Sequence, residues 1–173
     1  YDLDESQTTE EHEVDLIKVP ASGYYEVTAA KDKIVTRSEV DSSEAEKSFH
    51  LDTYCFDSNS ERILFWDLLR EQKVKKIYFT GMLTHGQSEF FIQYIDPDSR
   101  TVRSYYPDFV FLREEADGSE KFVIVEVKGD HQIDDSVVQA KKDFAQQIAV
   151  ASGMEYRIIK STDADQRRFR VLM

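Results

Sequence analysis

Two carboxylates and a lysine stand within one short stretch of the chain, "YYPDFVFLREEADGSEKFVIVEVKGD" at residues 105–130. Asp108 follows a proline, and Glu126 and Lys128 close an otherwise apolar run. Asp117-Gly118, a strong signal for a hairpin turn, lies midway between the two carboxylates. Because opposed residues of two paired strands have Cβ atoms roughly 5 Å apart, we expect Asp108 and Glu126 to face each other.

This trio of side chains suits metal-dependent hydrolysis of a phosphodiester. Two carboxylates so close repel each other, and one holds a proton unless a cation joins them. Mg²⁺ prefers carboxylate oxygens and keeps several waters, and we expect Mn²⁺ to substitute for it. Lys128 lies two residues beyond Glu126 and therefore on the same face of the strand. A metal and a lysine together can position a water and neutralise charge during in-line attack on phosphorus.

Each half of the pattern also has an ordinary explanation. An aspartate after a proline is common in turns, and "EVKGD" could be a strand that runs out into solvent. The presence of both halves on facing strands favours a site over these explanations. A carboxylate pair could also hydrolyse a glycoside at separations of roughly 5–9.5 Å, but nothing in the sequence marks a sugar-binding cleft.

The elements around the trio alternate between strand and helix patterns. Ser58 and Glu61 have the spacing of a capping box and open a helix at 58–72. A second helix spans 134–153, between capping residues and Gly153. The predicted strands are 75–83, 89–95, 100–112 with an interruption at Pro107, 121–127 with both faces buried, 155–160 and 168–173. This order predicts the α/β class, with a central mixed sheet flanked by helices.

The acidic residues are concentrated before the first helix. Of the net charge of -12, residues 1–60 contribute 15 acidic and 5 basic side chains, and residues 61–173 contribute 19 and 17. We therefore predict an acidic extension or linker with short strands at 1–57 and a second domain at 58–173. Within the extension, 1–20 is read as a tail, 24–30 and 33–40 as strands, and 41–48 as a loop.

The composition and the absence of certain motifs indicate the cell compartment and exclude some classes of protein. The single cysteine, Cys55, cannot form an internal disulfide and is read as a small buried residue. No apolar run is long enough to span a membrane and no signal peptide opens the chain, so we expect a cytoplasmic protein without membrane contact. The absence of Met at position 1 suggests a piece of a longer protein. No P-loop motif occurs, so the chain carries no such motor of its own.

With "PDF" at 107–109 and "EVK" at 126–128, the sequence resembles the PD-(D/E)XK nuclease superfamily, which has the restriction-endonuclease-like fold. The resemblance covers about residues 58–160 and implies an αβββαβ core. The run from "FDSNSERILFWDLL" through "FVIVEVKGD" looks most like the nuclease domain of type III restriction enzyme Res subunits.

The resemblance implies roles for individual residues. Asp108 and Glu126 would bind Mg²⁺ together with the main-chain carbonyl of Val127, and Lys128 would orient the attacking water or stabilise the transition state. Glu61 matches a glutamate that many members carry on the first helix, although it could equally serve only as the capping residue. Lys141 could reach over the sheet toward the site or lay its stem along the edge of the core. Gln139 lies toward the polar face of the same helix.

The expected function is cleavage of double-stranded DNA by a metal-dependent endonuclease domain. The low charge after residue 60 implies weak intrinsic DNA affinity. A type III context would supply an ATP-dependent helicase-like domain and a methyltransferase or specificity subunit as partners. Basic side chains at strand ends and in "DQRRFR" at 165–170 could contact phosphates or simply be solvated. The alternative is an inactive nuclease-fold module that binds DNA or serves a structural role.

Overall fold

The computed structural model describes residues 31–48, 53–81 and 90–173. The tail predicted at 1–20 and the strand predicted at 24–30 lie outside the described residues, as does His85, a histidine in the connection between the strands predicted at 75–83 and 89–95. Within the described part, no helix is both long enough and apolar enough to cross a membrane.

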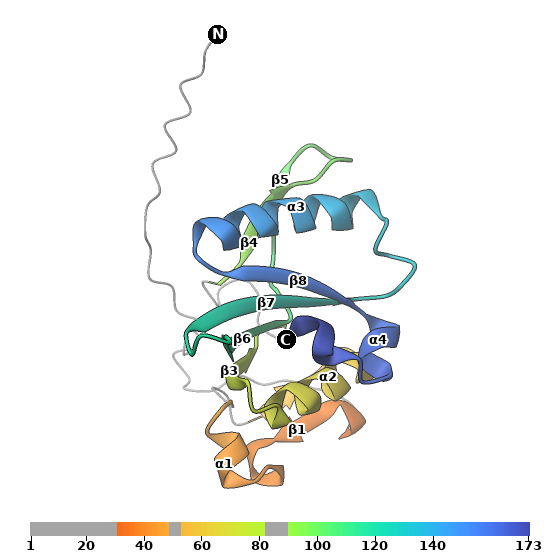
Figure 1. The fold of residues 1–173 in the computed structure, drawn as a ribbon. Helices are drawn as coiled ribbons and strands as arrows, with labels where there is room; N and C mark the ends of the chain where they lie inside the picture. The colour runs from red at the N-terminus through yellow and green to blue at the C-terminus, as the bar shows by residue number, and fades with distance from the viewer. Residues whose placement is uncertain (1–30, 49–52, 82–89) are drawn as a thin grey trace, which may run out of the picture.

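A four-stranded mixed sheet forms the centre of the molecule (Figure 1). Its strands are β3 (Val74–Phe79), β6 (Phe109–Glu114), β7 (Glu120–Lys128) and β8 (Glu155–Lys160), in the spatial order β3-β6-β7-β8. β6 pairs antiparallel with both β3 and β7, and β8 runs parallel to β7. The parallel pair requires a crossover, which α3 (Ser136–Ala151) provides. Four consecutive buried residues in β7, 123–126, confirm that this strand is covered on both faces.

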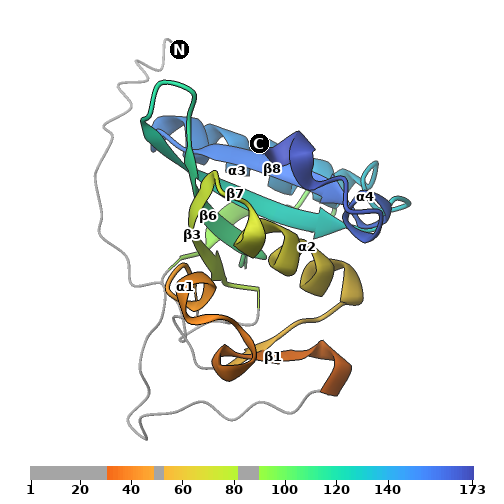
Figure 2. The same ribbon diagram turned by 60° about the horizontal axis from the view of Figure 1, so that its bottom comes forward.

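Helices cover the two faces of this sheet (Figures 1 and 2). α2 (Asn59–Arg70) begins at Ser58 with the predicted capping box and lies on one face. α3 lies on the opposite face and begins at Asp135, whose carboxylate accepts a hydrogen bond from the Val137 N–H. The order of α2, the strands, α3 and β8 confirms the predicted α/β class with an αβββαβ core, which is the restriction-endonuclease-like fold.

The strand predicted at 100–112 is in fact two strands in different sheets. β5 (Val102–Tyr105) pairs with β4 (Ile92–Ile95) in a separate two-stranded hairpin beside α3, whereas β6 belongs to the central sheet. Pro107 lies in the break, since it has no N–H for a ladder and restricts the residue before it. This hairpin is an insertion between β3 and β6 of the core.

The N-terminal described segment packs against α2. It consists of a 3-10 turn, η1 (Lys31–Lys33), then β1 (Ile34–Thr36), η2 (Arg37–Glu39), α1 (Ser42–Ala45) and β2 (Thr53–Cys55). The loop predicted at 41–48 thus contains a short helix, because Ala45 is buried and the Ala45 N–H bonds to the Asp41 carbonyl. Tyr54 and Phe56 share a core cluster with Phe65; the domain boundary at 57/58 remains a prediction.

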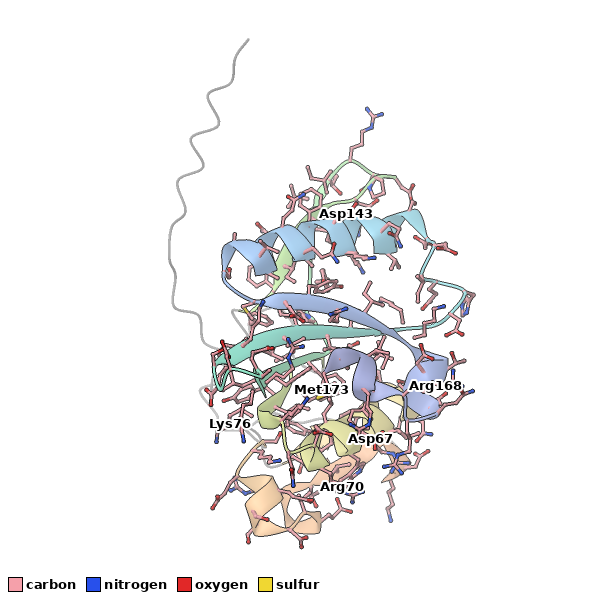
Figure 3. The ribbon with its side chains drawn as sticks, viewed as in Figure 1. Asp67, Arg70, Lys76, Asp143, Arg168 and Met173 are labelled. Carbon is pink, nitrogen blue, oxygen red and sulfur yellow. The ribbon has the colours of Figure 1, made fainter. Side chains whose placement is uncertain are left out.

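The predicted strand at 168–173 is wrong. After β8 the chain forms α4 (Ser161–Asp165) and η3 (Phe169–Leu172). Arg167 adopts a positive φ of 60° and its guanidinium pairs with buried Asp67 on α2 at 2.7 Å, which turns the chain back over α2. Figure 3 labels Asp67 on α2, and Arg168 and Met173 in the C-terminal segment. Buried Arg113 donates a hydrogen bond to the Leu172 carbonyl at 2.9 Å. These side-chain contacts with the C-terminal segment replace a strand ladder.

Candidate active site

The hairpin of β6 and β7 brings Asp108 and Glu126 together. Phe109 pairs with Val125. The residues one step outward, Asp108 and Glu126, are therefore opposed, as the sequence predicts. The N–H of Val127 donates to Asp108 Oδ2 at 2.8 Å, which joins the two strand ends directly.

The end of β3 fixes the backbone around Asp108. The N–H groups of Thr80 and Gly81 donate to the Asp108 carbonyl at 2.8 and 3.1 Å, and the Thr80 hydroxyl donates to the Pro107 carbonyl at 2.6 Å. A Cβ at position 81 would lie 2.9 Å from Asp108 Oδ1. Gly81 therefore leaves room for the carboxylate, and a larger residue there would displace it.

Negative charge is concentrated around Asp108. Burial raises the pKa of Asp108 well above its ordinary value, and the charges of Glu126 and Glu61 and a hydrogen bond with Glu61 raise it further, while the Val127 N–H opposes the shift. Burial also raises the pKa of Glu126, against the lowering effect of Lys128. The metal-free site thus favours a proton, and a cation would stabilise the ionised carboxylates.

Glu126 has one oxygen in use and one free. Its Oε1 lies 3.0 Å from Lys128 Nζ. Its Oε2 is buried without a hydrogen-bond partner, and a buried carboxylate oxygen without a partner is costly. Burial acts to lower the pKa of Lys128, but the charges of Glu126, Asp108 and Glu61 outweigh it and raise that pKa. Lys128 is therefore a cation here and not a base.

Glu61 serves the helix and the site at the same time. Its Oε2 accepts hydrogen bonds from the Ser58 N–H at 2.8 Å and from the Ser58 hydroxyl at 3.0 Å, which is the capping arrangement. The side chain is also buried close enough to Asp108 to raise the pKa of Asp108. The two explanations left open by the sequence are thus compatible, because the first turn of α2 lies beside the strand ends.

Lys141 lies on the side of α3 that faces the site. Burial and the charge of Lys128 lower its pKa, whereas Glu126 and Asp108 act to raise it. Its Nζ lies 5.4 Å from the ring centre of Tyr94 and 5.3 Å from that of Tyr105. Sequence reasoning did not single out these tyrosines, which come from a hairpin whose position the sequence did not reveal. The alternation in β4, with Ile92 and Tyr94 buried, was the only available signal.

Other candidate residues have local roles. Gln139 Nε2 donates to the Ile133 carbonyl at 2.5 Å and so secures the loop before α3. Arg113 is buried and pairs with Glu115 and Glu155 at 2.7 and 2.8 Å, which makes it a structural residue and not an exposed phosphate contact. His131, which follows the lysine strand closely enough in sequence to be considered for a phosphate contact, is exposed in the loop after Gly129.

The donors present suit a small hard cation. Within the described residues, no group of three or more His, Cys, Asp or Glu side chains is arranged to hold a metal. The acidic donors of the opposed pair are Asp108 and Glu126, and Oε2 of Glu126 is buried without a partner. Two carboxylates and retained waters fit Mg²⁺, which is seldom enclosed by protein ligands alone. The Val127 carbonyl as a third donor remains a prediction.

Comparison with known families supports a nuclease module. Residues 83–161 match the family model described as the TnsA-like endonuclease N-terminal domain, whose fold is of the restriction-endonuclease-like PD-(D/E)XK kind. The matched segment contains Asp108, Glu126, Lys128 and Lys141 and ends at the start of α4. No curated protein matches the chain. The fold and the match support an endonuclease module, and they carry no sign of a type III restriction enzyme.

Proposed function

We propose that this chain is the cleavage module of a metal-dependent DNA endonuclease. The observation that supports the proposal most directly is the opposed pair of Asp108 and Glu126, with Lys128 beside it and one buried Glu126 oxygen without a partner. A folding role alone does not require a buried acidic pair, because buried charges without full pairing are destabilising. The similarity of residues 83–161 to TnsA-like endonucleases supports the same activity.

Asp108 and Glu126 would hold Mg²⁺, with the Val127 carbonyl as a further ligand and Mn²⁺ as a substitute. When bound, the ion would supply Lewis-acid activation of the scissile phosphate and of a water. The chain's own contribution begins with the Val127 N–H, which fixes one oxygen of Asp108 at 2.8 Å. That contact leaves the other Asp108 oxygen and Glu126 Oε2 as the oxygens for the cation.

Lys128 would act as a fixed positive charge. Its raised pKa keeps the ammonium protonated, so it can donate hydrogen bonds to the attacking water and to a phosphate oxygen. Such an ammonium stabilises the negative charge that develops on the phosphoryl oxygens during in-line attack. Glu61, held by its cap contacts with Ser58, would complete the acidic side of the site, and Lys141 would neutralise a substrate phosphate.

The substrate we infer is double-stranded DNA, with recognition supplied by other parts of a larger enzyme. Residues 61–173 carry nearly balanced charge, so strong nonspecific attraction to the phosphate backbone is not expected from this segment. The helicase-like and methyltransferase partners of a type III enzyme are one form such an assembly could take. The TnsA-like match gives no support to these particular partners, and in any such assembly this chain would provide the cutting site.

The first experiment is a titration with Mn²⁺ followed by electron spin resonance. We expect the wild type to bind, and Asp108→Asn and Glu126→Gln each to weaken binding strongly. Glu120→Gln is the matched control, because Glu120 is an exposed carboxylate at the other end of β7. Equal binding by all four proteins, or none by any, would refute the metal site and favour an inactive nuclease-fold module. Cleavage of plasmid DNA with Mg²⁺ then tests the activity itself.

A further inference from the structure

The inserted β4–β5 hairpin presents two aromatic rings to the side of the candidate site. Tyr94 and Tyr105 are diagonal neighbours on one face of the hairpin, since Tyr94 pairs with Arg103 and Ile92 pairs with Tyr105. Their rings meet edge to face, with centres 6.1 Å apart. Diagonal neighbours lie within reach when the side chains are aromatic. The hairpin thus builds a two-ring surface facing α3.

The ammonium of Lys141 rests against both rings. Its Nζ lies 5.4 and 5.3 Å from the two ring centres, and a cation within about 6 Å of an aromatic centre is attracted by the ring. The rings are themselves held firmly. Tyr94 and Tyr105 are buried, and the Tyr105 hydroxyl donates to the Tyr156 hydroxyl of β8 at 3.0 Å. Lys141 is therefore positioned by an element outside the αβββαβ core.

This position has a consequence for Glu126. Lys128, and not Lys141, forms the ion pair with Glu126 in the part of the chain that the structure describes, and it uses only Oε1. The buried Oε2 has no partner, although a second ammonium stands near enough for the charges of Glu126 and Asp108 to act on it. Glu126 and Asp108 attract this ammonium, whereas Lys128 repels it. The two rings are the groups in contact with it, so they determine where it rests among these charges.

We propose that Tyr94 and Tyr105 are positioning residues that hold the Lys141 ammonium off Glu126. They leave Oε2 open to a divalent cation and keep the ammonium available to a substrate phosphate. This inference rests on the proposed metal-dependent nuclease function. The β4–β5 hairpin would then be a functional part of the site, because without its two rings the Lys141 ammonium would occupy the place of the cation.

The contact between the two rings and Lys141 can be detected by NMR in the wild type, without metal or DNA. In protein labelled with ¹³C at the lysine ε carbons, the Hε signal of Lys141, identified by its loss in Lys141→Arg, should be shifted upfield by the ring currents. Tyr94→Phe should keep most of that shift, and Tyr94→Leu should lose much of it. A wild-type Lys141 signal at the position of exposed lysines would overturn the proposal, whatever the variants do.

Mn²⁺ affinity tests what the rings do for the site. Tyr94→Leu should weaken Mn²⁺ binding by about three- to tenfold, the scale of a lost cation–π contact, with Tyr94→Phe close to wild type. Adding Lys141→Met to Tyr94→Leu should restore the affinity, since the competing ammonium is gone. A loss that persists in the double variant, or no loss in Tyr94→Leu, would overturn the positioning role.

The two proposals fail in different ways. If the wild type binds no Mn²⁺, the nuclease proposal and the cation-site role of the rings both fall, while the NMR shift still reports whether the rings hold Lys141. If the wild type binds Mn²⁺ and loses it in Asp108→Asn, but Tyr94→Leu binds normally, the metal site stands and only the positioning role is refuted.

Discussion

The two faces of the central sheet are built from the same strands and differ in one respect, since only the α3 face carries the candidate site. Along β7, Val123, Val125 and Val127 point into the cluster under α2. The alternate residues Glu126 and Lys128 stand on the other face, toward α3. The α2 side is filled with aromatic and aliphatic side chains. The α3 side has an apolar cluster of its own, which includes Ile124 and three tyrosines, and it also carries the carboxylates and lysines of the candidate site.

The α2 face contributes mainly stability, and the α3 face carries the chemistry of the candidate site. Apolar burial on the α2 side is stabilising at every contact. Buried charge on the α3 side is destabilising unless it is paired, and Glu126 Oε2 is not. The strands can carry this cost because their other face is so well packed. Substitutions on the two faces should therefore fail in different assays.

The largest loss of stability should come from truncating a large buried side chain on the α2 side. Phe111 is fully buried between Ile77 and Val123 on neighbouring strands, so Phe111→Ala should lower the free energy of unfolding by about 3–5 kcal/mol. Urea denaturation measures it. Phe122→Ala is the control, since Phe122 is 41% exposed on the adjacent strand. Equal losses in the two variants would contradict the division between the faces.

Removing the Lys128 ammonium on the α3 side should lower the rate of DNA cleavage and leave the free energy of unfolding nearly unchanged. Lys128→Ala is expected to lower the rate of DNA cleavage by about 100-fold or more, the scale seen when one charge-stabilising donor is lost. Its unfolding free energy should change little. When Lys128 no longer pairs with the Glu126 carboxylate, that buried carboxylate can take up a proton instead. Lys121→Ala, at the exposed end of the same strand, is the control. Unchanged cleavage in Lys128→Ala would refute the assigned role.

The acidic pair should make stability depend on pH in the absence of metal. Burial, Glu126 and Glu61 raise the pKa of Asp108 in the folded state, so the folded protein holds its proton more tightly than the unfolded chain. The contribution of Asp108 to stability should then be greatest in acid and fall as pH rises from the ordinary aspartate range through the raised pKa. Asp108→Asn should flatten this fall. Thermal melts in EDTA across pH measure it.

Adding Mn²⁺ sharpens the same experiment. The ion should stabilise the wild type at neutral pH, since it binds the folded carboxylates, and should do so far less in Asp108→Asn. A difference in melting temperature between wild type and Asp108→Asn that does not change with pH in EDTA would contradict the raised pKa of Asp108. A Mn²⁺ effect of equal size in both proteins would place the binding elsewhere.

The opposition of Asp108 and Glu126 could be predicted because it depends on local information alone. The Asp117-Gly118 turn fixes the register of a hairpin, and antiparallel pairing then determines every partner. The capping box of Ser58 and Glu61 is similarly local. Both were correct from sequence for this reason.

What the sequence did not reveal depends on contacts between distant elements. Residues 100–112 look like one strand broken at a proline, and only tertiary packing assigns β5 and β6 to different sheets. The C-terminal segment has a strand pattern, but it forms a turn and a 3-10 helix. Arg113 donates to its Leu172 carbonyl, and Asp67 pairs with its Arg167. The tyrosine surface behind Lys141 escaped notice because it needs the hairpin, α3 and β8 together.

Glu61 caps α2 and also acts on Asp108 in the candidate site. Two substitutions, with the smallest effects that we expect, separate these roles. Ser58→Ala removes the hydroxyl that accepts from the Glu61 N–H and should lower the free energy of unfolding by about 1 kcal/mol, with cleavage nearly unchanged. Glu61→Gln keeps an oxygen for the Ser58 N–H but removes a charge beside Asp108. It should therefore change metal affinity and cleavage more than stability. If Glu61→Gln matched Ser58→Ala in both assays, Glu61 would be a capping residue only, and the acidic side of the site would consist of Asp108 and Glu126.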